Sequence, residues 1–137
     1  MKYCLYTDGA ARGNPGPGGA GVCLTDENNV VVAVGSRYLG EVTNNVAEYK
    51  ALILGLKLAK RYQVVELQIL SDSELMVRQI QGKYRVKNEQ LKKIYNQVMK
   101  LLKDFKYQIS HIGREKNKVA DKLANEALDQ KFERLGR

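Results

Sequence analysis

The chain has 137 residues and a formal net charge of +8, with 44% hydrophobic and 28% charged residues. This length predicts a single domain over residues 1–137, large enough to bury a core without disulfides or a structural metal. No run approaches the roughly 18 apolar residues of a membrane span, and no basic start followed by an apolar run suggests a signal peptide. We therefore expect a cytoplasmic protein, monomeric and without a membrane partner.

Three β-strands are predicted in the first forty residues. Apolar residues 3–7 form the first strand, which ends at Asp8, and residues 20–26 and 30–39 form the next two. Short links between consecutive strands favour an antiparallel meander.

The first link, residues 9–19, consists mostly of glycine, proline and small residues. Such residues allow tight turns and a close approach to another molecule, and an acid at a strand end beside such a loop is a common ligand position in α/β proteins. Residues 16–21 match the letters of a dinucleotide-binding fingerprint, but strand-like residues follow where that fingerprint requires a helix. No Gly-Lys-Ser/Thr follows, which excludes a nucleoside-triphosphate loop, and a long hairpin connection is the remaining alternative.

Helical periodicity sets in after this meander and alternates with two further strands. Helices are predicted over residues 45–61, 71–81, 91–102 and 119–128, and strands over residues 64–70 and 105–112. The order βββαβααβα predicts an α/β fold with a five-stranded mixed sheet, its first three strands antiparallel, flanked by helices.

The positive charge is concentrated in residues 78–106, which contain nine basic and two acidic side chains, a net of +7. A basic segment on an otherwise balanced chain is typical of proteins that bind a phosphate backbone. A solvated lysine-rich helix face is the alternative, and a membrane surface fits less well because no broad apolar face is free of core packing.

Two cysteines, Cys4 and Cys23, lie in separate apolar runs without a further cysteine or histidine at ligand spacing. This pattern favours buried free thiols in a reducing compartment. The hairpin could bring their strands together, so a cross-strand disulfide is the alternative.

Four carboxylates follow predicted strands or begin predicted helices: Asp8, Glu48, Asp72 and Asp121. If the first and fourth strands are parallel neighbours, Asp8 and Asp72 emerge side by side, and crowded carboxylates require a cation between them. Mg²⁺ prefers such ligands and keeps waters for a phosphate substrate. Four acids around a gap of about 4 Å meet the requirement of a two-metal phosphodiester site.

Each acid also has a structural explanation. Asn45-x-x-Glu48 and Ser71-x-x-Glu74 match capping boxes, and an acid in a first helical turn interacts with the helix dipole by about 0.3–1 kcal/mol. Asp8 has no helix to cap, so this alternative is weaker for Asp8.

Four ordered motifs resemble ribonuclease H of type 1, and the similarity covers residues 3 to about 129. They are Tyr6-Thr7-Asp8-Gly9 with Gly13-Asn14-Pro15-Gly16-Pro17-Gly18, Thr43-Asn44-Asn45-Val46-Ala47-Glu48, Ser71-Asp72-Ser73 and Asn117-Lys118-Val119-Ala120-Asp121. The resemblance implies the mixed-sheet fold above and endonucleolytic hydrolysis of the RNA strand of an RNA–DNA hybrid, leaving 5′-phosphate and 3′-hydroxyl ends.

The resemblance also implies a cofactor of two Mg²⁺ ions, for which Mn²⁺ could substitute. Asp8 would bridge both ions, Asp121 would complete the site of the water-activating ion, and Glu48 and Asp72 would complete that of the ion facing the leaving group.

The same resemblance assigns six residues to hybrid recognition. The residues that resemble those approaching the RNA minor groove and its 2′-hydroxyls are Gly13, Asn14, Asn44 and Asn45. The residues that resemble those holding a DNA-strand phosphate are Thr43 and Asn88. Helix capping is the alternative for Asn44 and Asn45, and we expect one of them to cap.

Two features depart from the family pattern. Arg114 takes the place of a loop histidine credited in bacterial members with proton transfer or product release; arginine cannot shuttle a proton near neutral pH but could draw a phosphate away. The only histidine, His111, ends the fifth strand and is expected to be structural. The short link 82–87 lacks the basic protrusion of some relatives, so hybrid affinity would rest on the third helix and its flanks.

Two further functions are alternatives to hybrid hydrolysis. One is a hybrid-binding module without turnover, against which the presence of all four acids argues. The other is a nuclease or nucleotidyl transferase of the same fold that acts on DNA junctions or double-stranded RNA.

Overall fold

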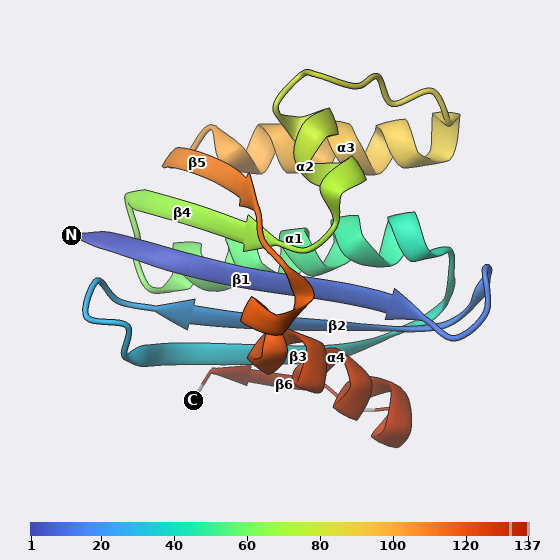
Figure 1. Ribbon diagram of the computed structural model, residues 1–137, viewed down its shortest axis with the longest axis horizontal. Coiled ribbons are helices and arrows are strands. Elements are labelled where there is room, and N and C mark those ends of the chain that lie inside the picture. Colours follow the sequence, from blue (N-terminus) through green and yellow to red (C-terminus); the bar gives the residue numbers. More distant parts are fainter. Residues whose placement is uncertain (132, 137) are drawn as a thin grey trace.

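The computed structural model describes residues 1–131 and 133–136, and within them a twisted mixed sheet forms the centre of the molecule (Figure 1). The strand order across the sheet is β5-β4-β1-β2-β3-β6. The strands are β1 (Lys2–Ala11), β2 (Gly16–Thr25), β3 (Val31–Val42), β4 (Glu66–Ser71), β5 (Lys106–His111) and β6 (Glu133–Gly136).

The pairing of the strands confirms the predicted mixed sheet. β1, β2 and β3 are antiparallel neighbours, and β4 and β5 run parallel to β1. β6 adds a sixth, antiparallel strand beside β3, which the five-strand prediction did not include. The segment is short and follows the last helix without a clear alternation of apolar residues, so only its pairing with β3 identifies it.

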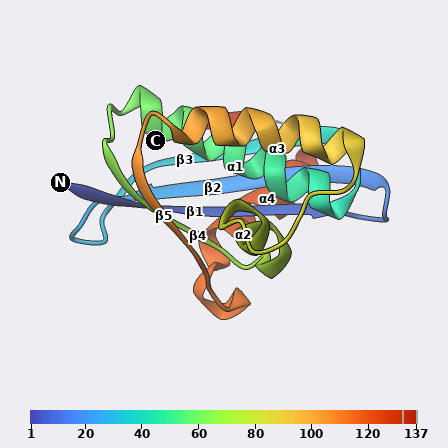
Figure 2. The ribbon, with the colours of Figure 1, turned by 90° about the horizontal axis from the view of Figure 1, so that it is seen from above.

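The helices form layers on both faces of the sheet. They are α1 (Asn44–Arg61), α2 (Glu74–Ile80), α3 (Glu89–Leu102) and α4 (Lys118–Gln130), with a 3₁₀ turn at Arg114–Lys116 before α4. α1 packs on β1 and β2 with α3 outside it (Figure 2), and α4 packs on β1, β2 and β3 from the opposite face. None of the described helices combines the length and apolar composition needed to cross a membrane.

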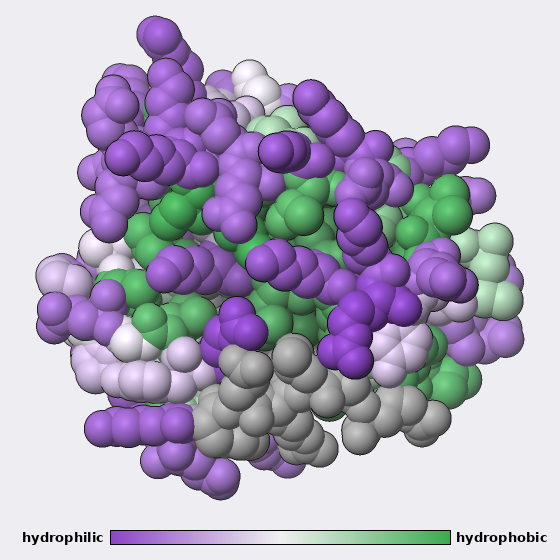
Figure 3. Space-filling model, turned by 180° about the vertical axis from the view of Figure 1, so that it is seen from behind, coloured by the Kyte–Doolittle hydropathy of each residue, from purple (hydrophilic) through white to green (hydrophobic). Residues whose placement is uncertain are grey.

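The main core lies between α1 and the sheet. α1 is apolar around most of its circumference, because one side meets the sheet and another meets α3. Leu5 of β1 packs on Gly55 of α1, where an added Cβ would come within 2.8 Å of the leucine. Seen from the α1 and α3 side, the outer surface is mostly hydrophilic with apolar patches between the helices (Figure 3).

The glycine-rich link is shorter than the sequence predicts. β1 continues to Ala11 and β2 begins at Gly16, so Ala11 pairs with Gly18 and only four residues turn between the strands. Ladder hydrogen bonds and a close packing partner override the low strand propensity of glycine here. An added Cβ at Gly21 would lie 2.1 Å from the Ala120 carbonyl oxygen, so these glycines let α4 approach the sheet.

The predicted capping residues are corrected by the structure. Thr43 caps α1, because its hydroxyl accepts the Val46 N–H, while Asn44 and Asn45 lie inside the helix. Ser73 caps α2 in the same way, because Ser71 still belongs to β4 and pairs with Thr7. Neither predicted capping box forms.

Cys4 and Cys23 are free thiols, as the sequence favoured. The hairpin register places Cys4 opposite Thr25 and Cys23 opposite Tyr6, so the two cysteines are diagonal rather than directly paired. Diagonal neighbours are about 7–8 Å apart between Cα atoms, beyond the usual disulfide span.

Candidate active site

Two of the four acids come together because β1 and β4 are parallel neighbours. The register pairs Thr7 with Ser71, so the next residues, Asp8 and Asp72, lie side by side where the strands diverge. Asp8 is 5% exposed. This placement is the one that the sequence predicted for a parallel pair.

Glu48 reaches the same place from α1. The Gly9 N–H donates to Glu48 Oε1 at 3.0 Å, directly after Asp8 on β1. An added Cβ at Gly9 would lie 2.2 Å from the Ala47 carbonyl oxygen. Glycine at this position therefore allows the helix to deliver its carboxylate to the strand.

Asp121 approaches from the opposite face on α4. The side chain of Asn117, 1% exposed, donates from Nδ2 to the Thr7 carbonyl oxygen at 2.9 Å, and the Asn117 carbonyl accepts the Asp121 N–H at 3.1 Å. Asn117 thus joins the start of α4 to β1 one residue before Asp8. Asn117 begins the last of the four sequence motifs, and no local pattern of side chains indicates this contact with β1.

The four acids line one hollow of about 530 Å³. Asp8, Glu48 and Asp72 each offer a carboxylate oxygen, and these atoms lie within 4.8 Å of one another. Asp121 stands outside this trio, but it lines the same hollow, and its proximity contributes to the raised pKa of Asp8. All four predicted acids therefore meet.

This crowding changes the acidity of two of the carboxyls. Burial, followed by the charges of Glu48 and Asp72, raises the pKa of Asp8 to about 9. Burial also raises the pKa of Glu48 to about 8, although the hydrogen bond from Gly9 partly opposes the shift. Buried carboxylates that repel one another are stabilised by a bound cation, and an all-oxygen donor set suits hard divalent ions such as Mg²⁺ or Mn²⁺.

His111, which the sequence analysis expected to be structural, also lines this hollow. β5 runs parallel to β4 and pairs Ser71 with His111, so the histidine ends at the same edge of the sheet as Asp72. The residue is exposed. The position of His111 at the end of a strand was the sequence signal for a place in the site. Only the register between β4 and β5 shows which edge of the sheet the histidine reaches.

Arg114 lies in the 3₁₀ turn on the rim of the same hollow. Its Nε is 3.9 Å from Asp72 Oδ2, and its side chain is 85% exposed. An ion pair at this distance in solvent contributes little to stability, roughly 0–1 kcal/mol. Its guanidinium therefore remains available to a passing anion.

The residues matched to hybrid recognition gather beside the acids. Thr43, Asn45, Asn14 and Asn88 line a neighbouring hollow of about 240 Å³. Thr43 and Asn88 cap α1 and α3, so the starts of two helices meet there.

Hydrogen bonds to asparagine side chains connect the glycine turn with the start of α1. The Asn44 N–H donates to Asn14 Oδ1, and the Ala11 N–H donates to Asn44 Oδ1, each at 3.0 Å. Gly13 of this turn has a φ of +105°, a conformation that favours glycine. The structure brings all six residues to one side of the acidic hollow.

This combination of a mixed sheet, helices on both faces and four convergent acids defines the ribonuclease H-like class of proteins. A family model described as "Reverse transcriptase-like" matches residues 6–127. Solved structures support the fold at low sequence identity as well: LC9-RNase H1 is 16% identical with a TM-score of 0.78.

Nearer relatives identify the family. LC11-RNase H1, isolated from compost by a metagenomic approach and solved in complex with RNA/DNA hybrid, is 44% identical with a TM-score of 0.90, over 94% of this chain and 98% of that one. RNase H1 of Halobacterium salinarum is 38% identical with a TM-score of 0.92, over 94% and 98%. The chain belongs to the ribonuclease H type 1 family.

Some curated relatives are longer than this chain. The "Bifunctional protein Rv2228c" of Mycobacterium tuberculosis is 41% identical over 131 residues, which make up 94% of this chain and 36% of that protein. The chain spans 63% of the Halobacterium salinarum sequence named "Ribonuclease HI", at 39% identity.

Proposed function

We propose that this protein is a metal-dependent endonuclease that hydrolyses the RNA strand of RNA–DNA hybrids and leaves 5′-phosphate and 3′-hydroxyl ends. The observation that carries the proposal is the meeting of carboxylate oxygens from β1, α1 and the end of β4 within 4.8 Å, in a hollow that Asp121 also lines. Similarity to a protein solved with bound RNA/DNA hybrid supports the choice of substrate.

The metal would be held by the four acids. Asp8 would bridge two Mg²⁺ ions, Asp121 would complete the site on the water side, and Glu48 and Asp72 would complete the site on the leaving-group side. When bound, such ions activate a water molecule and stabilise the leaving oxygen of a phosphodiester. Mn²⁺ would fit the same oxygen donors.

Two other residues of the hollow would assist proton transfer and attract phosphate. Imidazole can accept and donate protons near neutral pH, so His111 on the pocket wall would assist proton transfer to the leaving oxygen or from water. Arg114, exposed on the rim, would attract the 5′-phosphate of the product, because guanidinium binds phosphate oxygens in pairs.

Recognition of the hybrid would use the neighbouring hollow and the asparagines. Thr43 and Asn88, at the starts of α1 and α3, would hold a DNA-strand phosphate, because helix N-termini favour anions. Gly13, Asn14, Asn44 and Asn45 would face the RNA minor groove, where amides and small residues read 2′-hydroxyls.

The test is cleavage of matched labelled hybrid, RNA duplex and DNA duplex with Mg²⁺ and Mn²⁺, by the wild type and by Asp8→Asn. We expect metal-dependent cleavage of the hybrid RNA strand, and a loss of at least about a thousandfold in the variant because one ligand shared by both ions becomes neutral. Hybrid binding without cleavage in either metal would instead assign a binding module. Equal cleavage of duplex DNA would reject the hybrid substrate.

A further inference from the structure

The carboxylate of Asp121 has a hydrogen-bond partner one turn later on its own helix. Asn125 Nδ2 lies 3.0 Å from the Asp121 carbonyl oxygen and 3.4 Å from Asp121 Oδ1. The other end of the same amide, Oδ1, accepts from Nη2 of Arg12 at 3.5 Å. Because Arg12 can only donate, the amide oxygen must face the arginine, and the amide N–H groups must face Asp121.

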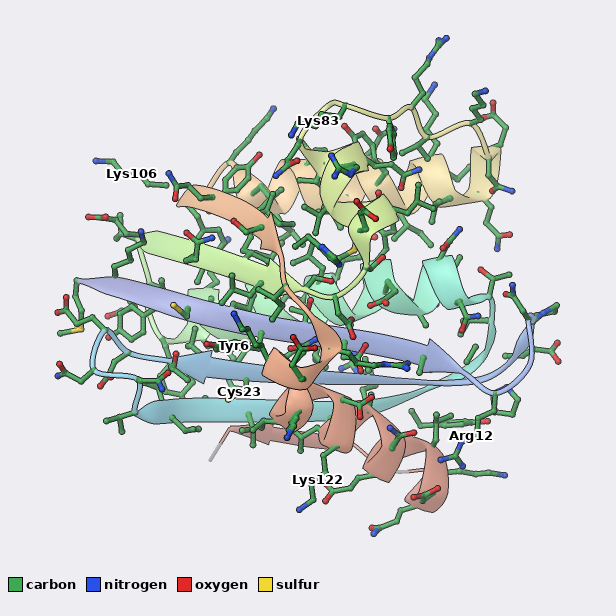
Figure 4. All side chains as sticks on the ribbon, viewed as in Figure 1. Tyr6, Arg12, Cys23, Lys83, Lys106 and Lys122 are labelled. Atoms are coloured by element: carbon green, nitrogen blue, oxygen red, sulfur yellow. The ribbon has the colours of Figure 1, made fainter. Side chains whose placement is uncertain are left out.

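Arg12 is itself fixed in place between the glycine turn and α4 (Figure 4). Its N–H donates to the Pro17 carbonyl at 2.8 Å, and its Nη2 forms a 2.7 Å ion pair with Asp129 Oδ1. Both side chains are more than half exposed, so the pair adds little stability, roughly 0–1 kcal/mol. The ion pair does hold the guanidinium beside Asn125.

α4 is therefore tied to β1 on both sides of Asp121. Asn117, four residues before Asp121, bonds to Thr7, which precedes Asp8. Asn125, four residues after it, bonds to Arg12, which follows the end of β1. Asn117 contacts Asp121 through the backbone N–H of Asp121, whereas Asn125 contacts the carboxylate of Asp121.

We propose that Asn125 is a positioning residue for Asp121, and that Arg12 couples this contact to the turn containing Gly13 and Asn14. The proposal rests on the proposed function, in which Asp121 binds a metal ion. A donor on one carboxylate oxygen restricts the rotation of the group and leaves the other oxygen for the cation. Partners of this kind typically change metal affinity or activity by about 10–100-fold when removed.

The first experiment measures Mg²⁺ binding without substrate, by NMR of the Asp121 backbone amide, which the wild type and every variant retain. Asn125→Ala should weaken Mg²⁺ binding by about tenfold, the low end for such partners because the contact is long and partly exposed. The matched control is Gln130→Ala, which removes an exposed amide from the same helix and should bind Mg²⁺ as the wild type does. Unchanged Mg²⁺ affinity in Asn125→Ala would overturn the positioning role.

Folding is checked in parallel. Alanine favours a helix more than asparagine does, so Asn125→Ala should keep its Tm within a few degrees of the wild type. Asn125→Ser, which retains a short donor, should recover part of the Mg²⁺ affinity. No recovery, with both variants folded, would argue that the amide acts only through packing.

A double-mutant cycle tests the coupling to Arg12. If Arg12→Gln acts through Asn125, it should weaken Mg²⁺ binding in the wild type but add nothing in Asn125→Ala. Independent effects that multiply in the double variant would reject the coupling.

Hydrolysis of hybrid provides a separate readout. At saturating Mg²⁺ the kcat of Asn125→Ala should return toward the wild-type value, while the Mg²⁺ concentration for half-maximal rate rises. A wild type that never cleaves hybrid would refute the proposed function and leave the Mg²⁺-binding result standing. A cleaving wild type with an unaffected Asn125→Ala variant would refute only this inference.

Discussion

Asp8 sits at the centre of the acidic hollow, 5% exposed and close to Glu48 and Asp72. Its ionised form is disfavoured there unless a cation is bound, because water is excluded and two negative charges lie nearby. The residue that the proposed chemistry most needs is therefore also a source of instability in the metal-free protein.

The stability of the metal-free protein should depend on pH through Asp8. The folded-state pKa is about 9 and the ordinary value is 3.8, so the folded state binds the proton more tightly over this range. The free energy of unfolding should fall as pH rises from about 4 to 9. In Asp8→Asn this slope should be reduced, and the variant should exceed the wild type in stability at pH 8.

Urea unfolding in EDTA across this pH range provides the measurement. Added Mg²⁺ should stabilise the wild type and have a smaller effect on Asp8→Asn, since the metal binds the ionised carboxylates of the folded state. Parallel pH profiles for the two proteins would contradict the assignment of the slope to Asp8.

His111 and Arg114 line the same hollow and should differ in their kinetic effects. If the imidazole transfers a proton, His111→Gln should lower kcat by about a hundredfold with little change in KM. Arg114→Gln should slow product release, visible as a larger burst in pre-steady-state kinetics. A burst of equal size in both variants would argue against separate roles for the two residues.

At the scale of elements, the site depends on two close approaches of helices to strands. The absence of a side chain at Gly9 lets the start of α1 pack closely on β1. The absence of a side chain at Gly21 lets α4 pack closely on β2 at Ala120, the residue before Asp121. Interiors pack densely, so a single added methyl group at such a contact must displace the helix.

Gly21→Ala should destabilise the protein by about 1–3 kcal/mol and shift α4, and with it Asp121. Cleavage activity should fall in a sample that is still folded. Gly40→Ala is the matched control: its φ is +74°, but nothing lies within 4 Å of the added Cβ. That change should lower stability by about 1–2 kcal/mol through backbone strain alone and leave the activity intact. Urea unfolding and hybrid cleavage measure both quantities, and an active Gly21→Ala protein would show that α4 tolerates the shift.

At the scale of the whole molecule, a basic segment lies next to an acidic hollow. The link between α2 and α3 carries three exposed cations, Lys83, Arg85 and Lys87, and ends at Asn88, which lines the candidate phosphate hollow. This arrangement allows a polyanion to bind beside carboxylates that would otherwise repel it.

Replacing these three cations by glutamine should weaken hybrid binding and its dependence on salt. Each lost phosphate contact should reduce the slope of log K against log [salt] by about 0.9 for B-form DNA, and by a similar amount here. Lys106→Gln is the control, because Lys106 begins β5 at the end opposite His111, far from the acids (Figure 4). Binding assays between 50 and 200 mM salt test this; an equal change of slope per charge removed in the control would assign the effect to net charge alone.

Several features of the whole molecule were predictable from the sequence. Apolar periodicity gave the order of strands and helices, because each pattern is local and reports which side of an element is buried. The four acids were also predictable, since the sequence places each one at a predicted strand end or near the start of a predicted helix. The predictions of a single domain, a monomer and a cytoplasmic location stay predictions.

Other features were decided only by tertiary contacts. The glycines of β1 and β2 join strands because α4 and α1 press against them, and β6 forms because β3 offers a free edge. His111 reaches the acids through the β4–β5 register, and Asn125 reaches Arg12 although 113 positions separate them. These contacts join residues far apart in the chain, and no local pattern of side chains encodes which distant partner a residue will meet.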